Sequence, residues 1–223
     1  MTRLFSDPKS RGNLLTTALQ ALYDELFGAA PEIDVKINYG ASTFPDFDAE
    51  THLKLSMRRR VSRRYKSGIT LSKEAICGLL STGLGDTSCE GRQGYAIPTA
   101  GAVRDLRYIV CVRLTQHPQL FEFIPENRIM SHLIDVQFRE FSIESWEQDS
   151  IFNLIYCYSS TPRRTYANNL LHLAFEAGCA SQNISLLSTQ IGANHCVSGI
   201  LNVGEFRKMF GTSLIPMHMI SVM

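Results

Sequence analysis

Basic side chains crowd residues 57–68, MRRRVSRRYKSG, where six of nine consecutive residues are Arg or Lys. Within this segment Arg60, Ser62 and Arg64 occupy alternate positions. In an extended segment alternate side chains point the same way, so two guanidiniums and a hydroxyl would converge on one object. A guanidinium matches phosphate oxygens bidentately, and the hydroxyl adds a donor. The spacing therefore suits a single phosphate monoester. A solvated basic face or a nucleic-acid patch is the alternative interpretation.

Small residues dominate two further segments. Residues 98–101, P-T-A-G, place a proline before three small residues, and small residues let a flat ring approach the backbone and face its N–H groups. A plain turn is the alternative interpretation of this segment. Residues 197–201, V-S-G-I-L, follow a long helical pattern and are by themselves only a strand with a glycine.

Predicted helices and strands surround these segments in the sequence and must position them. The sequence predicts helices over residues 13–27, after the N-cap Ser72, over 166–191 with Gly192 and Asn194 as its stop, and over 204–211. It predicts strands over 106–115, 120–125, 151–160, 195–201 and 214–223. The first two strands should form a hairpin and the third should be central, while residues 83–94 should form a loop. Because helices and strands do not alternate strictly, the expected class is α+β, with an N-terminal helix and arm over 1–50 and one domain over 51–223.

Composition narrows the class of protein. The chain has 223 residues, 44% of them hydrophobic, and a net charge of +1, which is typical of a globular domain. No apolar run reaches the roughly 18 residues of a membrane span, and the first residues lack the apolar stretch of a secretory signal. We therefore expect a cytoplasmic protein with no membrane partner. The six cysteines form no C-x-x-C pair, so reduced, mostly buried thiols and no metal site are expected.

Taken in order, the segments resemble those of the nitroreductase-fold flavoproteins. R-x-S-x-R at 60–64 resembles their FMN-phosphate motif, and P-T-A-G at 98–101 resembles the P-S-A-G loop against the flavin. E-A-G-C-A-S-Q-N-I-S-L-L-S-T-Q-I-G at 176–192 resembles the long helix at the dimer core. V-S-G-I-L at 197–201 resembles the loop near flavin N5. The resemblance implies a nitroreductase-like fold with a mixed sheet flanked by helices, and a homodimer with FMN between its subunits.

Within that fold the sequence resembles the azoline dehydrogenases of the microcin B17 and streptolysin S type. H-x-K-L-S at 52–56, P-T-A-G-A-V-R-D-L at 98–106 and E-A-G-x-x-x-Q-N at 176–183 carry this resemblance. One feature departs from it, because the subgroup has a Lys-Tyr pair before the long helix and Thr165 stands here in place of the lysine. Tyr166 matches the tyrosine.

The resemblance implies an FMN-dependent oxidation of thiazoline or oxazoline rings of a precursor peptide to thiazoles or oxazoles. Tyr166 is the candidate base, with His172 and His195 as alternatives and a structural aromatic as the other interpretation of Tyr166. The implied partners are a YcaO-family cyclodehydratase and a peptide-binding protein, with no nucleic acid. The implied FMN contacts are Arg60, Ser62, Arg64, Pro98, Thr99, Ala100, Gly101, Ser198 and Gly199.

Other functions stay open from the sequence. A general FMN nitroreductase or quinone reductase that uses a nicotinamide cofactor has the same motifs. A flavoprotein subunit of the synthetase without activity is favoured by Thr165. A basic nucleic-acid module would be colourless and would bind DNA in a salt-sensitive way.

Overall fold

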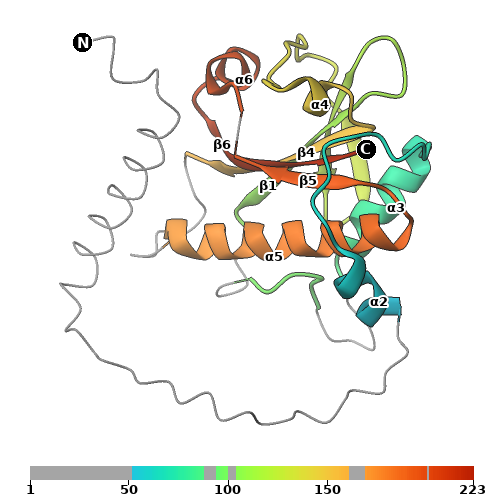
Figure 1. The fold of residues 1–223 in the computed structure, drawn as a ribbon. Helices are drawn as coiled ribbons and strands as arrows, with labels where there is room; N and C mark the ends of the chain where they lie inside the picture. The colour runs from blue at the N-terminus through green and yellow to red at the C-terminus, as the bar shows by residue number, and fades with distance from the viewer. Residues whose placement is uncertain (1–51, 88–93, 100–103, 161–168, 200) are drawn as a thin grey trace, which may run out of the picture. The chain divides into compact units, whose positions relative to one another are not determined.

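A six-stranded sheet is central to the structure, a computed structural model that describes residues 52–87, 94–99, 104–160, 169–199 and 201–223. The spatial order of the strands is β3-β2-β1-β4-β6-β5 (Figure 1), and each neighbouring pair of these strands is antiparallel. The strands are β1 (Leu106–Val112), β2 (Gln119–Ile124), β3 (Ile129–His132), β4 (Phe152–Ser159), β5 (His195–Ser198) and β6 (Leu214–Val222).

The apolar runs of β1 and β4 explain why these strands lie in the middle. The first six residues of β4 are all buried, and β4 pairs with β1 on one side and β6 on the other. The predicted central strand and the predicted β1–β2 hairpin are thus confirmed. The β4–β6 register shifts between Tyr156 and Cys157, where Pro216 lies opposite Cys157. Proline has no N–H to donate to the ladder, which accounts for an irregularity at this position.

Helices lie on both faces of the sheet, as expected for the α+β class. On one face are α5 (Asn169–Gln190) and α3 (Lys73–Leu84), and on the other are α6 (Val203–Phe210) and α4 (Ser145–Gln148) (Figure 1). The core on the α5 face includes Leu80, Val110, Phe121, Leu154, Tyr156, Ala177, Ala180, Ile184 and Ile220. The core on the α6 face includes Ile109, Cys111, Phe141, Ile155, Phe206 and Met219.

Local signals set the ends of the helices. The Ser72 hydroxyl accepts a hydrogen bond from the backbone N–H of Ala75 at 3.1 Å, which makes it the N-cap that the sequence predicts for α3. Asn202 caps α6 in the same way. Gly192, just beyond α5, has a φ of 82°, a conformation that glycine adopts without a steric penalty.

Some elements differ from the sequence prediction. No strong signal marks α2 (His52–Arg59), β3 or α4, because these elements are short and β3 is largely exposed. The strand predicted over 106–115 ends at Val112, where the polar network described below begins. The predicted loop 83–94 starts late, since Gly83 still belongs to α3 and is buried there.

Several sequence predictions concern parts of the chain outside the described residues. These are the helix over 13–27, residues Ala100 and Gly101, and Tyr166. The described residues all fall in one unit, Ala49–Met223, and the division into 1–50 and 51–223 stays a prediction. No helix in the described part of the chain is long and apolar enough to cross a membrane.

The packing of α5 against the sheet yields a stability prediction. Ile184 is fully buried, so Ile184→Ala should lower the free energy of unfolding by about 2–5 kcal/mol, through lost burial and the cavity left behind. The exposed Leu171 on the same helix is the control, and Leu171→Ala should change that free energy by no more than about 0.5 kcal/mol. Denaturant unfolding measures both, and equal losses would contradict this arrangement of α5.

Candidate functional site

The segment that carries Arg60, Ser62 and Arg64 follows α2 and runs beside β5. Ser62 forms a parallel bridge with His195, and the Arg63 N–H donates to the His195 carbonyl at 2.9 Å. This bridge adds a parallel contact to an otherwise antiparallel set of strands. The pairing is at Ser62 alone, and the Arg60 N–H still donates to the Ser56 carbonyl of α2 at 2.9 Å. That the side chains of residues 60, 62 and 64 share one side stays a prediction from their alternation. All three are exposed.

Lys66 of this segment pairs with the Asp149 carboxylate at 3.4 Å, but its arginines lack such partners among the described residues. Among the described residues, none of the arginines from 58 to 64 forms an ion pair. Arg63 instead donates to the Asn194 side-chain oxygen at 3.5 Å and lies over the Tyr65 ring at 6.0 Å, while the Arg64 guanidinium lies 5.7 Å from the centre of the Trp146 ring. A group of exposed, uncompensated cations attracts anions.

Asn194 anchors the basic segment, a role that sequence reasoning missed. Its side-chain amide donates to the Tyr65 carbonyl at 2.9 Å, and its backbone N–H and carbonyl exchange hydrogen bonds of 3.0 and 2.8 Å with Met223. The Ser67 hydroxyl donates to the Met223 carbonyl at 2.6 Å. In the sequence Asn194 gives only a helix-stop signal. Its anchoring of the basic segment depends on a contact between segments more than a hundred residues apart in the sequence.

The two alternative bases, His172 and His195, have different surroundings. His172 is exposed on α5. The His195 side chain is 1% exposed, and neither ring nitrogen has a hydrogen-bond partner of normal geometry among the described residues. Burial first, and then the nearby Arg60 guanidinium, lower the pKa of His195 below its ordinary value, and a backbone group of Ala193 partly offsets this. The structure thus favours a neutral, enclosed imidazole at position 195.

The other end of β5 carries Ser198 and Gly199. Ser198 is buried and pairs with Met219 of β6, whereas Gly199 is exposed and a Cβ added there would meet nothing within 4 Å. Ser198 lies three residues after His195, which is roughly 10 Å along a strand. A single short strand therefore connects the basic segment to the small residues of the predicted N5 loop.

Pro98 and Thr99 lie on the α5 side of the sheet. Asn183 of α5 donates to the carbonyls of Gly83 and Ala96, at 3.0 and 2.9 Å, and so fixes the stretch just before Pro98. Asn183 is the last residue of the E-A-G-x-x-x-Q-N pattern, and its structural function is apparent only from these contacts. Pro98 is exposed beside α5, at a shallow apolar hollow lined by Phe175, Gly178 and Cys179.

Thr99 lines a cavity of about 450 Å³ between β1, β2, α3 and α5. In its wall the Arg104 guanidinium lies 3.5 Å from the centre of the Tyr95 ring and pairs with Glu126 at 3.1 Å. Arg60, Ser62 and Arg64 do not line this cavity. The structure therefore joins the basic segment to the Ser198 end of β5, whereas the cavity and the hollow beside Thr99 and Pro98 are lined by other residues. The described residues also contain no cluster of His, Cys, Asp and Glu that could hold a metal ion.

Comparisons with solved structures define the class of fold. A protein from Ralstonia eutropha described as a nitroreductase aligns with a TM-score of 0.59 at 15% identity, over 80% of this chain and 85% of that one. A chain of the E. coli microcin synthetase McbBCD complex with truncated pro-MccB17 bound aligns with a TM-score of 0.57 at 14% identity, over 98% and 94%. The chain therefore has a nitroreductase-like fold, as the sequence motifs predict.

A third similar structure, from Desulfovibrio desulfuricans, is described as a nitroreductase in complex with FMN. It aligns with a TM-score of 0.50 at 13% identity, over 78% of this chain and 86% of that one. The sequence matches no model of a known protein family and no curated protein. At these low identities, the shared feature is the fold.

The enclosed His195 yields a pH prediction. Because its pKa is lowered in the folded state, the unfolded chain binds more protons as the pH falls below about 6.5, and folding stability is lost in that direction. Unfolding measured between pH 7.5 and 5 should show this loss, and His195→Gln should reduce its slope. The exposed His117, replaced by Gln, is the control. An unchanged slope in His195→Gln would contradict the assigned environment.

Proposed function

We propose that this chain is an FMN-dependent oxidoreductase that oxidises thiazoline and oxazoline rings of a ribosomal precursor peptide to thiazoles and oxazoles. The observation that carries the proposal is the group of exposed arginines beside the start of β5, which have no ion-pair partner among the described residues, in a nitroreductase-like fold. A phosphate monoester is the anion that this spacing suits best. A similar structure is described as a complex with FMN, which supports FMN as the source of that phosphate.

The residues of the chain fit the proposed cofactor. Arg60 and Arg64 would hold the phosphate through their guanidiniums, and the Ser62 hydroxyl would donate a further hydrogen bond. The open space at Gly199 permits close approach of a flat ring to the backbone. Pro98, Thr99, Ala100, Gly101 and Ser198 complete the proposed FMN contacts.

The proposed reaction removes two hydrogens from each azoline ring. A base takes the proton from the ring carbon derived from Cα, and the neighbouring carbon loses a hydride. When bound, FMN supplies the hydride acceptor. Tyr166 is the proposed base, and since a tyrosine hydroxyl has an ordinary pKa of about 10, the adjacent Arg163 and Arg164 would serve to lower it.

The assembly is also part of the proposal. A similar structure comes from a microcin synthetase complex with a bound pro-peptide, which supports a heteromeric synthetase acting on a peptide. A YcaO-family cyclodehydratase would form the azolines, and a peptide-binding protein would present them. We further propose a cytoplasmic homodimer in which α5 contributes to the interface, because its exposed small residues Ala174 and Gly178 permit close helix approach, whereas Ala177 and Ala180 face the core.

Two alternatives have specific support. Similar structures described as nitroreductases favour a general reductase of nitroaromatics or quinones that uses a nicotinamide cofactor. Thr165, in place of the expected lysine, favours a subunit that binds FMN without turning over azolines. Two assays on the purified protein distinguish these alternatives. Rapid bleaching of its flavin by NADPH supports the reductase. Unchanged azoline peptide after incubation with the complete complex supports the inactive subunit.

The phosphate assignment yields a binding prediction. Arg60→Ala with Arg64→Ala should weaken FMN binding by on the order of a hundred-fold or more, because two charge-assisted contacts are lost. Flavin content after purification and fluorescence titration measure this. Arg58→Ala with Arg59→Ala, exposed at the end of α2, removes the same charge and is the matched control. If the two double variants lose FMN equally, or the first stays fully yellow, the assignment is wrong.

The chemistry yields a turnover prediction. With its partners and an azoline peptide, the protein should lower the peptide mass by about 2 Da per ring, as expected for loss of two hydrogens. Tyr166→Phe should reduce the rate by a factor of about 10²–10⁴ with FMN content unchanged, because it removes an acid–base group and not the cofactor contacts. Mass spectrometry follows both. Full activity in Tyr166→Phe would eliminate Tyr166 as the base. Thr165→Lys restores the lysine of the subgroup and should raise the turnover rate.

A further inference from the structure

The single tryptophan of the chain lies against the proposed phosphate-binding segment. The Arg64 guanidinium lies 5.7 Å from the centre of the Trp146 ring, within the range of cation–π attraction. A second contact joins the same two regions, since the Lys66 ammonium lies 3.4 Å from the Asp149 carboxylate. That ion pair is exposed and contributes little by itself. Together the contacts place α4 directly beside residues 64–66.

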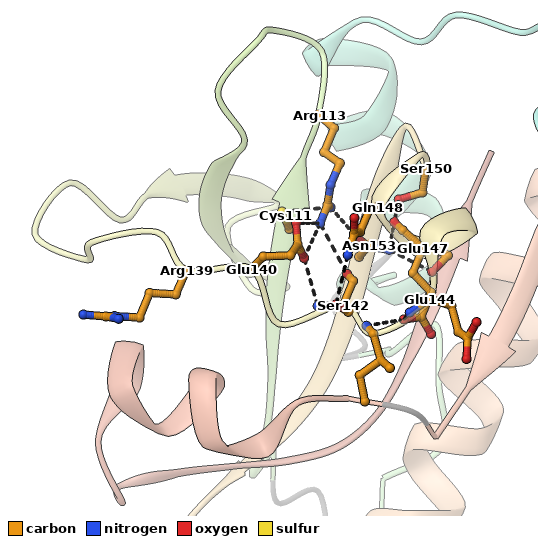
Figure 2. Close-up of polar contacts among 12 residues, drawn as sticks. Cys111, Arg113, Arg139, Glu140, Ser142, Glu144, Glu147, Gln148, Ser150 and Asn153 are labelled. Carbon is orange, nitrogen blue, oxygen red and sulfur yellow. Dashed lines mark hydrogen bonds and ion pairs between the residues drawn. The ribbon is translucent and has the colours of Figure 1, made fainter.

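Buried polar contacts fix α4 in place. Glu147 is fully buried, and its carboxylate accepts hydrogen bonds from the backbone N–H groups of Ile143 and Glu144 at 3.0 and 3.1 Å. Its carbonyl accepts from the Asn153 side chain at 3.2 Å, and Asn153 also donates to Ser221 at 2.8 Å. Figure 2 shows Glu147 of α4 and Asn153 of β4 close to one another, where the Asn153 side chain donates to the Glu147 backbone. The helix is thus attached to β4, whose Asn153 is itself bonded to β6.

Arg113 extends this attachment to the segment that precedes α4. Its guanidinium donates to both carboxylate oxygens of Glu140, at 2.9 and 3.0 Å, and to the Ser142 hydroxyl at 3.3 Å (Figure 2). It also donates to the side-chain oxygen of Asn153. The Arg113 side chain is 8% exposed, so these charge-assisted bonds form largely away from water and hold their geometry firmly.

We propose that Trp146 is a positioning residue for Arg64, an inference that rests on the proposed FMN function. A long exposed arginine loses rotamer freedom when it grips an anion. A ring held by a fixed helix keeps the Arg64 guanidinium near one orientation before the phosphate arrives, which reduces that loss. In this proposal Trp146 acts only through the Arg64 guanidinium. Its effect is confined to ligands that carry the phosphate.

Comparing FMN with riboflavin, which lacks the phosphate, tests the proposal in the full-length protein. Trp146→Leu should weaken FMN binding about two- to five-fold, the range expected for an exposed cation–π contact, with riboflavin binding unchanged. Trp146→Phe keeps an aromatic face and should restore most of the affinity. Ser145→Ala, exposed on the same helix, is the matched control and should bind FMN like the wild type. Flavin fluorescence titration measures all affinities, and circular dichroism checks folding.

A double-mutant cycle separates positioning from a general structural effect. In an Arg64→Ala background, Trp146→Leu should change FMN affinity no further, because the guanidinium that the ring orients is absent. Equal FMN affinities of wild type and Trp146→Leu, or equal losses for FMN and riboflavin, would overturn the inference and leave the proposed function standing. A wild-type protein that takes up no FMN would instead overturn the proposed function.

Discussion

The candidate site depends on the backbone pairing between the basic segment and β5. The bridge from Ser62 to His195 and the Arg63 hydrogen bond place several like charges side by side at the edge of the sheet. Like charges repel, so an exposed segment of this kind would otherwise spread apart in solvent. The Asn194 side chain also donates a hydrogen bond to the Tyr65 carbonyl, and this bond and the Ser62–His195 bridge together oppose the repulsion. The cations therefore remain available to an anion.

The packing of α5 and α4 on the two faces of the sheet positions that edge. The α5 helix packs along one face of the sheet and ends at Gln190, and the chain turns into β5 through Gly192. On the opposite face, the buried network around Arg113 and Glu147 holds α4 against β4. The basic segment consequently has β5 on one side and Trp146 on the other. Two packed cores, and not the segment's own propensity, determine its conformation.

Strong local patterns were predicted well, and weak or long-range ones were not. The apolar runs of β1 and β4 and the cap at Ser72 each depend on neighbouring residues, and the structure confirms them. The α4 helix has four residues and no apolar period, so apart from the Glu144 and Glu147 of its capping box its sequence carries little helical signal. The sequence analysis considered an extended segment at residues 60–64 but no pairing for it, because His195, the partner of Ser62, is 133 positions away and no local pattern indicates it.

The sequence by itself determined the α+β class, most of the strands and helices, and the alternation of Arg60, Ser62 and Arg64, because each is a property of residues close together in the chain. Only the tertiary structure decided that Ser62 pairs with the start of β5, that Arg60 and Arg64 have no carboxylate partner in the described part of the chain, that Asn194 anchors the segment and that Trp146 lies beside Arg64. Charge compensation and anchoring depend on which distant segments meet. That outcome follows from the packing of the sheet and its helices, which no short stretch of sequence encodes.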